Sequence, residues 1–484
     1  MHYGAVIKVM GRLMGVEAVM LLAPLAVSVC NAEPGAAGFA IASGASALLW
    51  CVAEAFTRHT PLRIGLREGF ILTALTWVIF SLTGLIPFMM CSHALGFTDA
   101  LFETISGFTT TGASVFADTG ELGKGVLLWR AETQWIGGLG IIFFMLAVLP
   151  ALNGREGISM FHAEATGIFH TRLHPRIRQS AVALWGVYSA LTIACILLLW
   201  AGPMSFFDAL CQTFAAISTG GFTTHAAGLA YWNSDYVDVV LTIFMIIGGL
   251  NFMLLYSAVA AGRWKELTGN AVARCYLCII LCAWALQSLA VYMNGQGHTL
   301  RQLLLMPLTH TVSAITSSGF TVENAEYWGP GALTVTMLIM IAGSCAGSTA
   351  GGVKIDRLMA IWSNMCNNLR RTVFTHRTYI VRIGRDPLDE ATVRRIQAFL
   401  TLYFGLILLT TLAATFLGYD FTDSLFMSVS AVGCNGLGYG ITGAEGGYAA
   451  LHPGLKYLLM ADMLAGRLEL FAFVTLLLPS FWRK

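Results

Sequence analysis

Long apolar stretches alternate with short polar segments along the whole chain. A helix needs about 20 mostly apolar residues to cross a membrane. The first stretch carries Arg12 and Glu17, which makes it unlike a cleaved signal peptide, and we interpret it as a retained span. Ten stretches qualify as spans, namely 5–30, 36–57, 69–91, 124–150, 179–202, 233–261, 271–294, 329–366, 396–417 and 453–480. The pattern therefore predicts an integral membrane protein built from helices.

Composition and charge support this interpretation. The chain is 56% hydrophobic and 11% charged, whereas soluble domains are typically about 25% charged. If both termini lie in the cytoplasm, the inner segments hold all of the 28 basic residues except Lys124, Arg130, Arg301, Lys456 and Arg467. Because basic residues are enriched in cytoplasmic loops, we expect both termini to be cytoplasmic.

Four segments of similar sequence lie in the predicted outer loops. The first is 99–112, DALFETISGFTTTG, and the others are 208–221, 306–319 and 423–436. Each opens with a helix-start residue, continues with apolar and small residues, and ends in a tail rich in Gly, Ser or Thr. Such a helix is too short to cross the bilayer and is tolerated at that depth only where protein or water surrounds it. We therefore expect four re-entrant pore helices that enter from outside.

The tails of these segments have the composition of a cation filter. Their glycines occupy one register, and none of the four tails contains a carboxylate. Glycine permits unusual backbone angles, and backbone carbonyls can replace the hydration shell of an ion, as they do for potassium. The negative ends of four helix dipoles would also favour a cation. The alternative is that each glycine only ends a helix; four copies in one register favour the filter.

Three further motifs carry a family resemblance, namely QWIGGLG at 134–140, GSCAGSTAGG at 343–352 and GRLE at 466–469. With the four loops, they make almost the whole chain resemble the Trk/Ktr/HKT superfamily of potassium transporters. The two extra N-terminal spans resemble its TrkH-type bacterial branch. The resemblance implies an all-α, potassium-channel-like membrane fold of four tandem helix/pore-loop/helix repeats in pseudo-fourfold arrangement. The expected units are an N-terminal two-helix extension (1–64) and the repeats 65–152, 153–264, 265–384 and 385–484.

The resemblance also implies a set of site residues. Some members that favour sodium have Ser at the first filter glycine, which here is Gly112, so potassium is the expected bound and transported ion. The implied carbonyl ligands are Thr111, Gly112, Gly220, Gly221, Ser318, Gly319, Asn435 and Gly436. The residues expected to support them are Thr110, Thr219, Ser317 and Cys434.

An unbroken run of small residues, 342–352, interrupts the predicted span 329–366. We expect a helix broken near mid-membrane, because irregular backbone at that depth must line a cavity or be buried in protein. In the resembling family this segment is an intramembrane gate, here with Gly343, Gly347, Gly351 and Gly352. The alternative is a small-residue face for close helix packing.

Arg467 lies near the middle of the last predicted span. A charge at that depth is costly and is usually functional. The favoured interpretation, which the resemblance suggests, is an electrostatic barrier in the ion path. The alternative is a structural ion pair with Asp462, Glu469 or Glu132.

The resemblance further implies a homodimer, a cytosolic nucleotide-binding regulatory subunit and a bacterial cytoplasmic (inner) membrane location. The sequence leaves open whether transport is a symport with protons or sodium or runs passively, and whether sodium or rubidium also passes. A membrane-embedded enzyme is disfavoured, because the equivalent positions Glu103, Gln212, His310 and Met427 share no chemistry and are interpreted as supports behind the filter. A non-transporting scaffold is the other alternative. Metal sites are disfavoured both at Cys275, Cys278 and Cys282, which have helical spacing in an apolar run, and at His162, His170 and His174, which lie in a basic linker.

Overall fold

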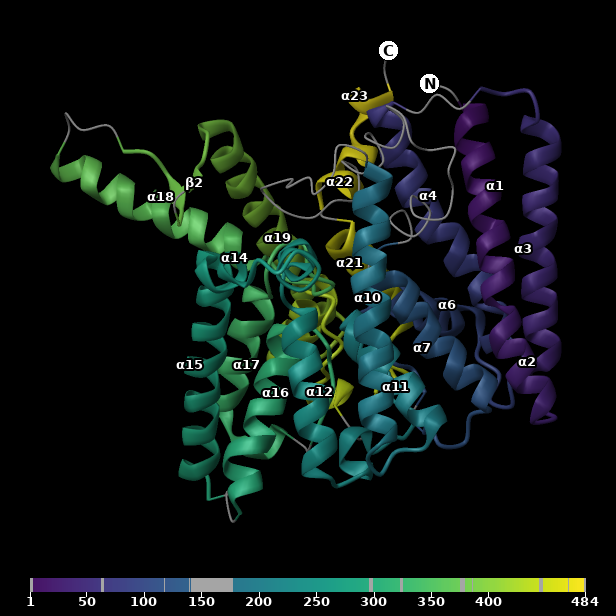
Figure 1. Ribbon diagram of the computed structural model, residues 1–484, viewed down its shortest axis with the longest axis horizontal. Helices are drawn as coiled ribbons and strands as arrows, with labels where there is room; N and C mark the ends of the chain where they lie inside the picture. Colours follow the sequence, from purple (N-terminus) through teal and green to yellow (C-terminus); the bar gives the residue numbers. More distant parts are fainter. Residues whose placement is uncertain are drawn as a thin grey trace.

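In a computed structural model, the chain is a bundle of helices with one small pair of strands (Figure 1). Both termini lie at the same end of the bundle (Figure 1). The structure describes residues 3–61, 65–116, 118–138, 140, 177–295, 299–322, 325–374, 379–384, 386–443, 447–468 and 470–482. The three histidines considered as a metal site lie outside these residues.

The N-terminal extension is a helical hairpin that packs against the first repeat. It consists of α1 (Tyr3–Met20), α2 (Leu22–Cys30) and α3 (Ala36–Thr57). Glu17 of α1 is buried, and its carboxylate accepts hydrogen bonds from Ser46 Oγ at 3.1 Å and from Thr83 Oγ1 at 2.7 Å. Because Ser46 belongs to α3 and Thr83 to α4 of the first repeat, this one carboxylate links α1 and α3 to the bundle.

Four units follow, each with a short pore helix between two longer elements. The first contains α4 (Leu66–Gly84), α5 (Ile86–Met89), α6 (Phe97–Phe108) and α7 (Lys124–Gly138). The second contains α10 (Ile177–Trp200), α11 (Phe206–Ser218), η2 (Gly228–Tyr231), α12 (Asp235–Gly248) and α13 (Phe252–Val259), and α14 (Trp264–Gly269) joins it to the third.

The third unit contains α15 (Ala271–Met293), η3 (Arg301–Leu305), α16 (Met306–Ile315), η4 (Ala325–Trp328), α17 (Pro330–Ala342) and α18 (Ile355–Val373). The strands β1 (Arg382–Ile383) and β2 (Asp386–Pro387) join the third unit to the fourth. The fourth contains α19 (Glu390–Phe416), α20 (Phe421–Val432), η5 (Gly440–Thr442), α21 (Pro453–Arg467), α22 (Phe471–Leu477) and α23 (Pro479–Trp482). The two strands pair antiparallel, with Arg382 opposite Pro387.

Six helical segments of the described chain are long and apolar enough to cross a membrane: Tyr3–Cys30, Ala36–Thr57, Arg67–Met89, Val182–Trp200, Ala271–Met293 and Glu390–Phe416. Each matches a predicted span. The expected break in 329–366 is also present, because α17 ends at Ala342 and α18 begins at Ile355. Part of the predicted span 124–150 lies outside the described residues.

Two predicted spans were wrong as continuous helices. The segment 233–261 divides into α12 and α13, which are bent by 104° at residues 249–251. The segment 453–480 is interrupted after Arg467, where Leu470 has a φ of 32°. A break of three residues inside a long apolar stretch leaves the mean hydropathy of the stretch high, so the hydrophobic pattern alone cannot detect it.

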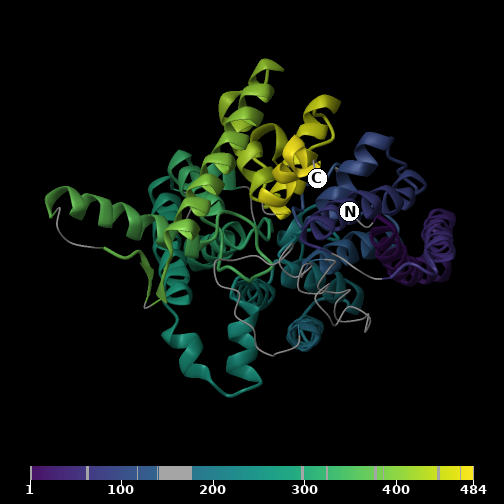
Figure 2. The ribbon, with the colours of Figure 1, turned by 90° about the horizontal axis from the view of Figure 1, so that it is seen from above.

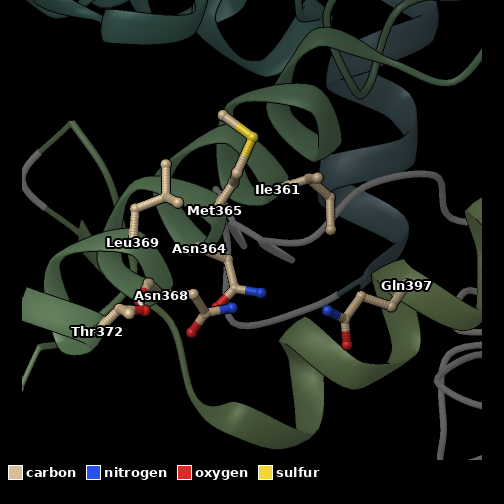
Figure 3. A pocket seen from close by; sticks show the side chains of 7 residues that line it. All are labelled: Ile361, Asn364, Met365, Asn368, Leu369, Thr372 and Gln397. Atoms are coloured by element: carbon tan, nitrogen blue, oxygen red, sulfur yellow. Dashed lines mark hydrogen bonds between the residues drawn. The ribbon is translucent and has the colours of Figure 1, made fainter.

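Seen from above, α18 projects sideways from the bundle (Figure 2). One face of α18 packs against Val381 and Ile383, at the β1–β2 strand pair, and against the start of α19. Beyond that contact, an open groove lies between α18 and α19, with Asn364 and Asn368 on one side and Gln397 on the other (Figure 3). The basic residues Arg370 and Arg371 end the helix. This projecting helix lies at the same end of the molecule as the two termini (Figure 1).

Candidate ion filter and intramembrane gate

The four pore helices α6, α11, α16 and α20 end in buried loops. Three of them begin two residues before the Asp that marks each repeat, so Asp99, Asp208 and Asp423 lie in the first helical turn. An acidic residue there is favoured by the helix dipole. Two of these helices also have a side-chain cap: Ser205 accepts from the backbone N–H of Asp208 at 3.1 Å, and Asp420 accepts from that of Thr422 at 2.8 Å. The third helix has Pro307 in its first turn, as the sequence indicated.

All four tails have the same backbone conformation. A left-handed residue is followed, two positions later, by a glycine with positive φ; the pairs are Thr110 and Gly112, Thr219 and Gly221, Ser317 and Gly319, and Cys434 and Gly436. In each tail the N–H of the intervening residue donates to a carbonyl of its own pore helix, as Thr111 does to Ser106 at 2.9 Å. Left-handed backbone at a helix C-terminus satisfies its last carbonyls. The repeat seen in the sequence is therefore also a repeat of backbone geometry.

The four tails meet in a closed ring. The carbonyl oxygen before each filter glycine lies against the filter glycine of the preceding loop, so closely that a Cβ on that glycine would overlap it. The contacts run from Gly112 to the carbonyl of Gly220, from Gly221 to that of Ser318, from Gly319 to that of Asn435, and from Gly436 back to that of Thr111. Because the fourth contact returns to the first loop, the four tails surround a common axis. The structure thus brings together all eight predicted ligand residues and all four predicted support residues.

In three of the four tails, the residue directly before the filter glycine fastens the tail with its own side chain. The hydroxyls of Thr109 and Thr111 are 2.8 Å apart, as are those of Thr316 and Ser318. Asn435 donates through Nδ2 to the carbonyl of Ala314 on the third pore helix at 2.6 Å. Each of these tails is held by the side chain directly before its filter glycine, which fixes the backbone that carries the carbonyl.

The loop 343–354, between α17 and α18, lies against the inner ends of the pore helices. Ser344 Oγ donates to the carbonyl of Ile315 at 2.9 Å, and Thr349 Oγ1 donates to that of Ile217 at 3.1 Å. These acceptors are pore-helix residues four positions before a filter glycine. The loop therefore lies directly beneath the ring of tails.

The four glycines predicted for the gate make the close fit of this loop possible. Gly343, Gly347 and Gly352 have positive φ. The Gly351 N–H donates to Ser317 Oγ at 2.6 Å, and a Cβ on Gly351 would overlap the carbonyl of Gly433. The small-residue run is thus a folded loop packed on the filter and not a helix-packing face.

The break between α12 and α13 supports the same loop from the second repeat. Asn251 caps α13 by accepting from Met253 N at 2.8 Å, and its Nδ2 donates to the carbonyl of Ala346 at 2.7 Å. Phe252 N donates to the carbonyl of Gly347 at 3.0 Å. Sequence analysis missed Asn251, although an Asn two residues after Gly249 and directly before an apolar run is a helix-start signal.

Arg467 is half-buried at the end of α21 and connects the loop to the first repeat. Its Nη1 donates to the carbonyl of Thr349 at 2.8 Å, and its Nη2 donates to that of Gly138 at 2.6 Å and to that of Gly137. Of the acids considered as partners, Asp462 accepts a hydrogen bond from Thr410 at 2.6 Å, and Glu469 lies outside the described residues. The guanidinium therefore stands where the loop, α7 and α21 meet.

The positions interpreted as supports are buried on the pore helices. Glu103 is fully buried and forms an ion pair with Arg130 at 2.8 Å, and His310 Nε2 lies 3.2 Å from Thr336 Oγ1. Gln212 and Met427 are also fully buried. Within the described residues, no group of three or more His, Cys, Asp or Glu side chains is placed to hold a metal, and Cys278 and Cys282 are exposed.

The ring, the loop beneath it and the membrane-length helices define a class: a membrane protein with an ion pathway formed by four re-entrant loops of one chain. The model of the TrkH family, described as a cation transport protein, matches residues 36–484. The Trk system potassium uptake protein TrkH of Salmonella typhimurium is 31% identical over 491 residues, with 100% of each chain covered. TrkH of Vibrio parahaemolyticus is 32% identical over 500 residues, again with 100% of each chain covered.

The crystal structure of the potassium transporter TrkH from Vibrio parahaemolyticus superposes on this chain with a TM-score of 0.90, at 28% identity and with 100% of both chains covered. The chain belongs to the TrkH family of cation transport proteins. Its relatives are transporters and not enzymes.

Proposed function

We propose that the chain takes up potassium across the bacterial cytoplasmic membrane through the four-loop filter. The observation that carries the proposal is the closed ring of carbonyls next to the four filter glycines. Carbonyl dipoles can replace the hydration shell of a potassium ion. The proposed ligands are the backbone oxygens of Thr111, Gly112, Gly220, Gly221, Ser318, Gly319, Asn435 and Gly436. In this role potassium is the cargo and occupies the filter in transit.

The loop 343–354 and Arg467 are proposed to form the gate. The packing of the loop beneath the ring supports this role, since an ion leaving the filter inward meets the loop first. Arg467 adds a positive charge next to the loop, and a partly desolvated cation repels another strongly. Three hydrogen bonds from its guanidinium also hold the loop against α7.

Further proposals concern assembly and orientation. The termini are proposed to be cytoplasmic, with repeats bounded at 65–152, 153–264, 265–384 and 385–484. The basic end of α18, which lies at the same end of the molecule as both termini, supports this orientation. As the resemblance implied, we propose a homodimer that works with a cytosolic nucleotide-binding regulatory subunit.

Flux into liposomes tests the proposed function. Purified protein reconstituted with internal potassium is expected to accumulate tracer rubidium, and external potassium is expected to inhibit this uptake more strongly than external sodium. Equal inhibition by sodium would favour the alternative of an unselective or sodium-permeable transporter. Absence of flux from folded, reconstituted protein would favour a scaffold.

A further inference from the structure

The second filter loop differs from the other three at the position before its filter glycine. Thr111, Ser318 and Asn435 hold this position in the other loops and fasten their own tails. The second loop has Gly220 there and so has no side chain to do this.

Gln134 of α7 occupies the place of the missing side chain. A Cβ on Gly220 would lie 2.7 Å from Gln134 Oε1 and 2.8 Å from Gln134 Cγ, within the volume of the glutamine. Gln134 Nε2 donates to the carbonyl of Gly220 at 2.7 Å, and Oε1 accepts from Phe222 N at 3.1 Å. The side chain is fully buried. One amide therefore fastens the tail on both sides of the filter glycine Gly221.

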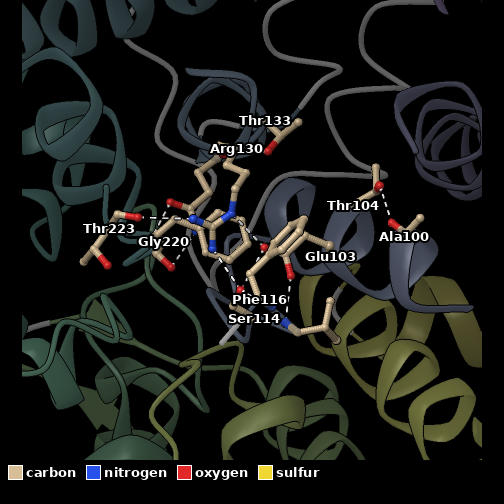
Figure 4. A network of polar contacts seen from close by, with 12 residues as sticks. Ala100, Glu103, Thr104, Ser114, Phe116, Arg130, Thr133, Gly220 and Thr223 are labelled. Carbon is tan, nitrogen blue, oxygen red and sulfur yellow. Dashed lines mark hydrogen bonds and ion pairs between the residues drawn. The ribbon is translucent and has the colours of Figure 1, made fainter. Parts of the chain in front are cut away.

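Arg130, one helical turn before Gln134, fastens the outer end of the same loop (Figure 4). Its Nη1 donates to the carbonyl of Thr223 at 3.1 Å, and its guanidinium carbon lies 4.1 Å from the centre of the Phe222 ring. Its Nε pairs with Glu103 at 2.8 Å, and Nη2 donates to Ser114 at 3.0 Å. Helix α7 thus connects the second tail both to the first pore helix, through Glu103, and to the segment that follows the first tail, through Ser114.

The other repeats have no such glutamine. Alignment of the glycines Gly137, Gly248, Gly343 and Gly466, near the breaks of the four second helices, places Met245, Met340 and Met463 at the position of Gln134. All three methionines are buried. Only the first repeat has a polar residue, Gln134, at this position. Its helix α7 contacts the second filter tail, the one that lacks a side chain before its filter glycine.

We propose that Gln134 is a positioning residue for ion selectivity, which substitutes from the neighbouring repeat for the side chain that Gly220 lacks. It holds the Gly220 carbonyl against Gly112, so the first and second loops keep the spacing that a dehydrated potassium ion requires. A carbonyl has two lone pairs, so the hydrogen bond from Gln134 leaves one for the ion. This inference rests on the proposed function of the ring as a selectivity filter.

A reciprocal pair of substitutions tests the proposal. Gln134→Ala is expected to lower the ratio of potassium to sodium flux about fivefold to tenfold, the scale of one lost buried hydrogen bond. Gly220→Ser alone is expected to lower it too, because the new side chain collides with Gln134. The double variant Gln134→Ala with Gly220→Ser is expected to recover most of the ratio. There the new hydroxyl can bond Ser218, as Ser318 bonds Thr316 in the third loop.

The controls separate selectivity from folding. Gln287 is also fully buried, and it bonds Thr336 at 3.0 Å and Thr311 at 2.7 Å without touching a filter tail among the described contacts. Gln287→Ala is expected to lower thermal stability while leaving the flux ratio unchanged. If Gln134→Ala does not fold, Gln134→Met, which introduces the residue of the other three repeats, replaces it in the same assay.

A wild-type protein without preference for potassium would overturn the proposed filter and this inference with it. A selective wild type whose ratio is unchanged in Gln134→Ala or Gln134→Met would overturn this inference alone. Equal losses of the flux ratio in the Gln134 and Gln287 variants would also overturn it. The same holds if the double variant lowers the flux ratio by the product of the two single-variant factors.

Discussion

Gly112→Ser is expected to lower the ratio of potassium to sodium flux at least tenfold. Gly112 has a φ of 82°, which an L-residue adopts only with strain, and a Cβ there would overlap the carbonyl of Gly220. The carbonyl of Gly220 must therefore move away from residue 112. Even a small shift of this carbonyl changes the distance at which it would coordinate a dehydrated ion. The measurement is tracer flux in liposomes with each cation in turn.

A matched glycine provides the control for this prediction. Gly405 lies within α19, with no atom within 4 Å of a Cβ added to it. Gly405→Ser is expected to leave the flux ratio unchanged. If folded Gly112→Ser protein kept the wild-type ratio, the assignment of Gly112 to the filter would be wrong.

Arg467→Ala is expected to raise potassium flux at least tenfold. The substitution removes a charge close to the proposed ion path and three hydrogen bonds that hold the proposed gate loop against α7. Hydrogen bonds from charged groups contribute about 1.5–3 kcal/mol each, and a tenfold change in rate needs only about 1.4 kcal/mol. Initial rates of rubidium uptake measure the effect. Unchanged or lower flux from folded protein would contradict the gate assignment.

Two further variants divide the contributions of charge and tether. Arg467→Lys keeps the charge but loses the planar fork that reaches several carbonyls, so its flux is expected to lie between wild type and Arg467→Ala.

Asn251→Ala removes another hydrogen bond that holds the loop, the one to the carbonyl of Ala346, and is expected to raise potassium flux. Asn270 caps α15 in the way that Asn251 caps α13, by accepting from Val272 N at 2.9 Å and Ala273 N at 3.0 Å, and it does not touch the loop through those contacts. Asn270→Ala is expected to cost stability alone.

The sequence was sufficient to predict the four pore helices and the break before α18. The pore helices were predicted from glycines in one register, and the break from a long run of small residues. Both signals lie in contiguous sequence, so they can be recognised without a structure. The bend after Gly248 and the break after Arg467 were missed, because an interruption of three residues hardly changes the mean hydropathy of a span. At the first of these breaks Asn251 donates to the carbonyl of Ala346 in the third repeat, a contact that the hydropathy of the second repeat does not encode.

The role of Gln134 shows the same limit at the candidate site. Its motif, QWIGGLG, was recognised, yet the side chain acts on a tail 86 residues further along the chain. Only the folded ring reveals that Gly220 lacks the fastening side chain of its three counterparts. Contacts between repeats depend on how the repeats close around the axis, and a pattern along one chain does not specify that closure.

The central claim is that the four tails present their carbonyls to one potassium ion on a shared axis. Anomalous diffraction from crystals grown with rubidium or thallium tests it most directly. We expect ion density at the centre of the ring, within coordination distance of the carbonyls of Thr111, Gly220, Ser318 and Asn435, and its loss when sodium replaces rubidium. Density confined to sites away from the ring, in protein that transports rubidium, would contradict the account.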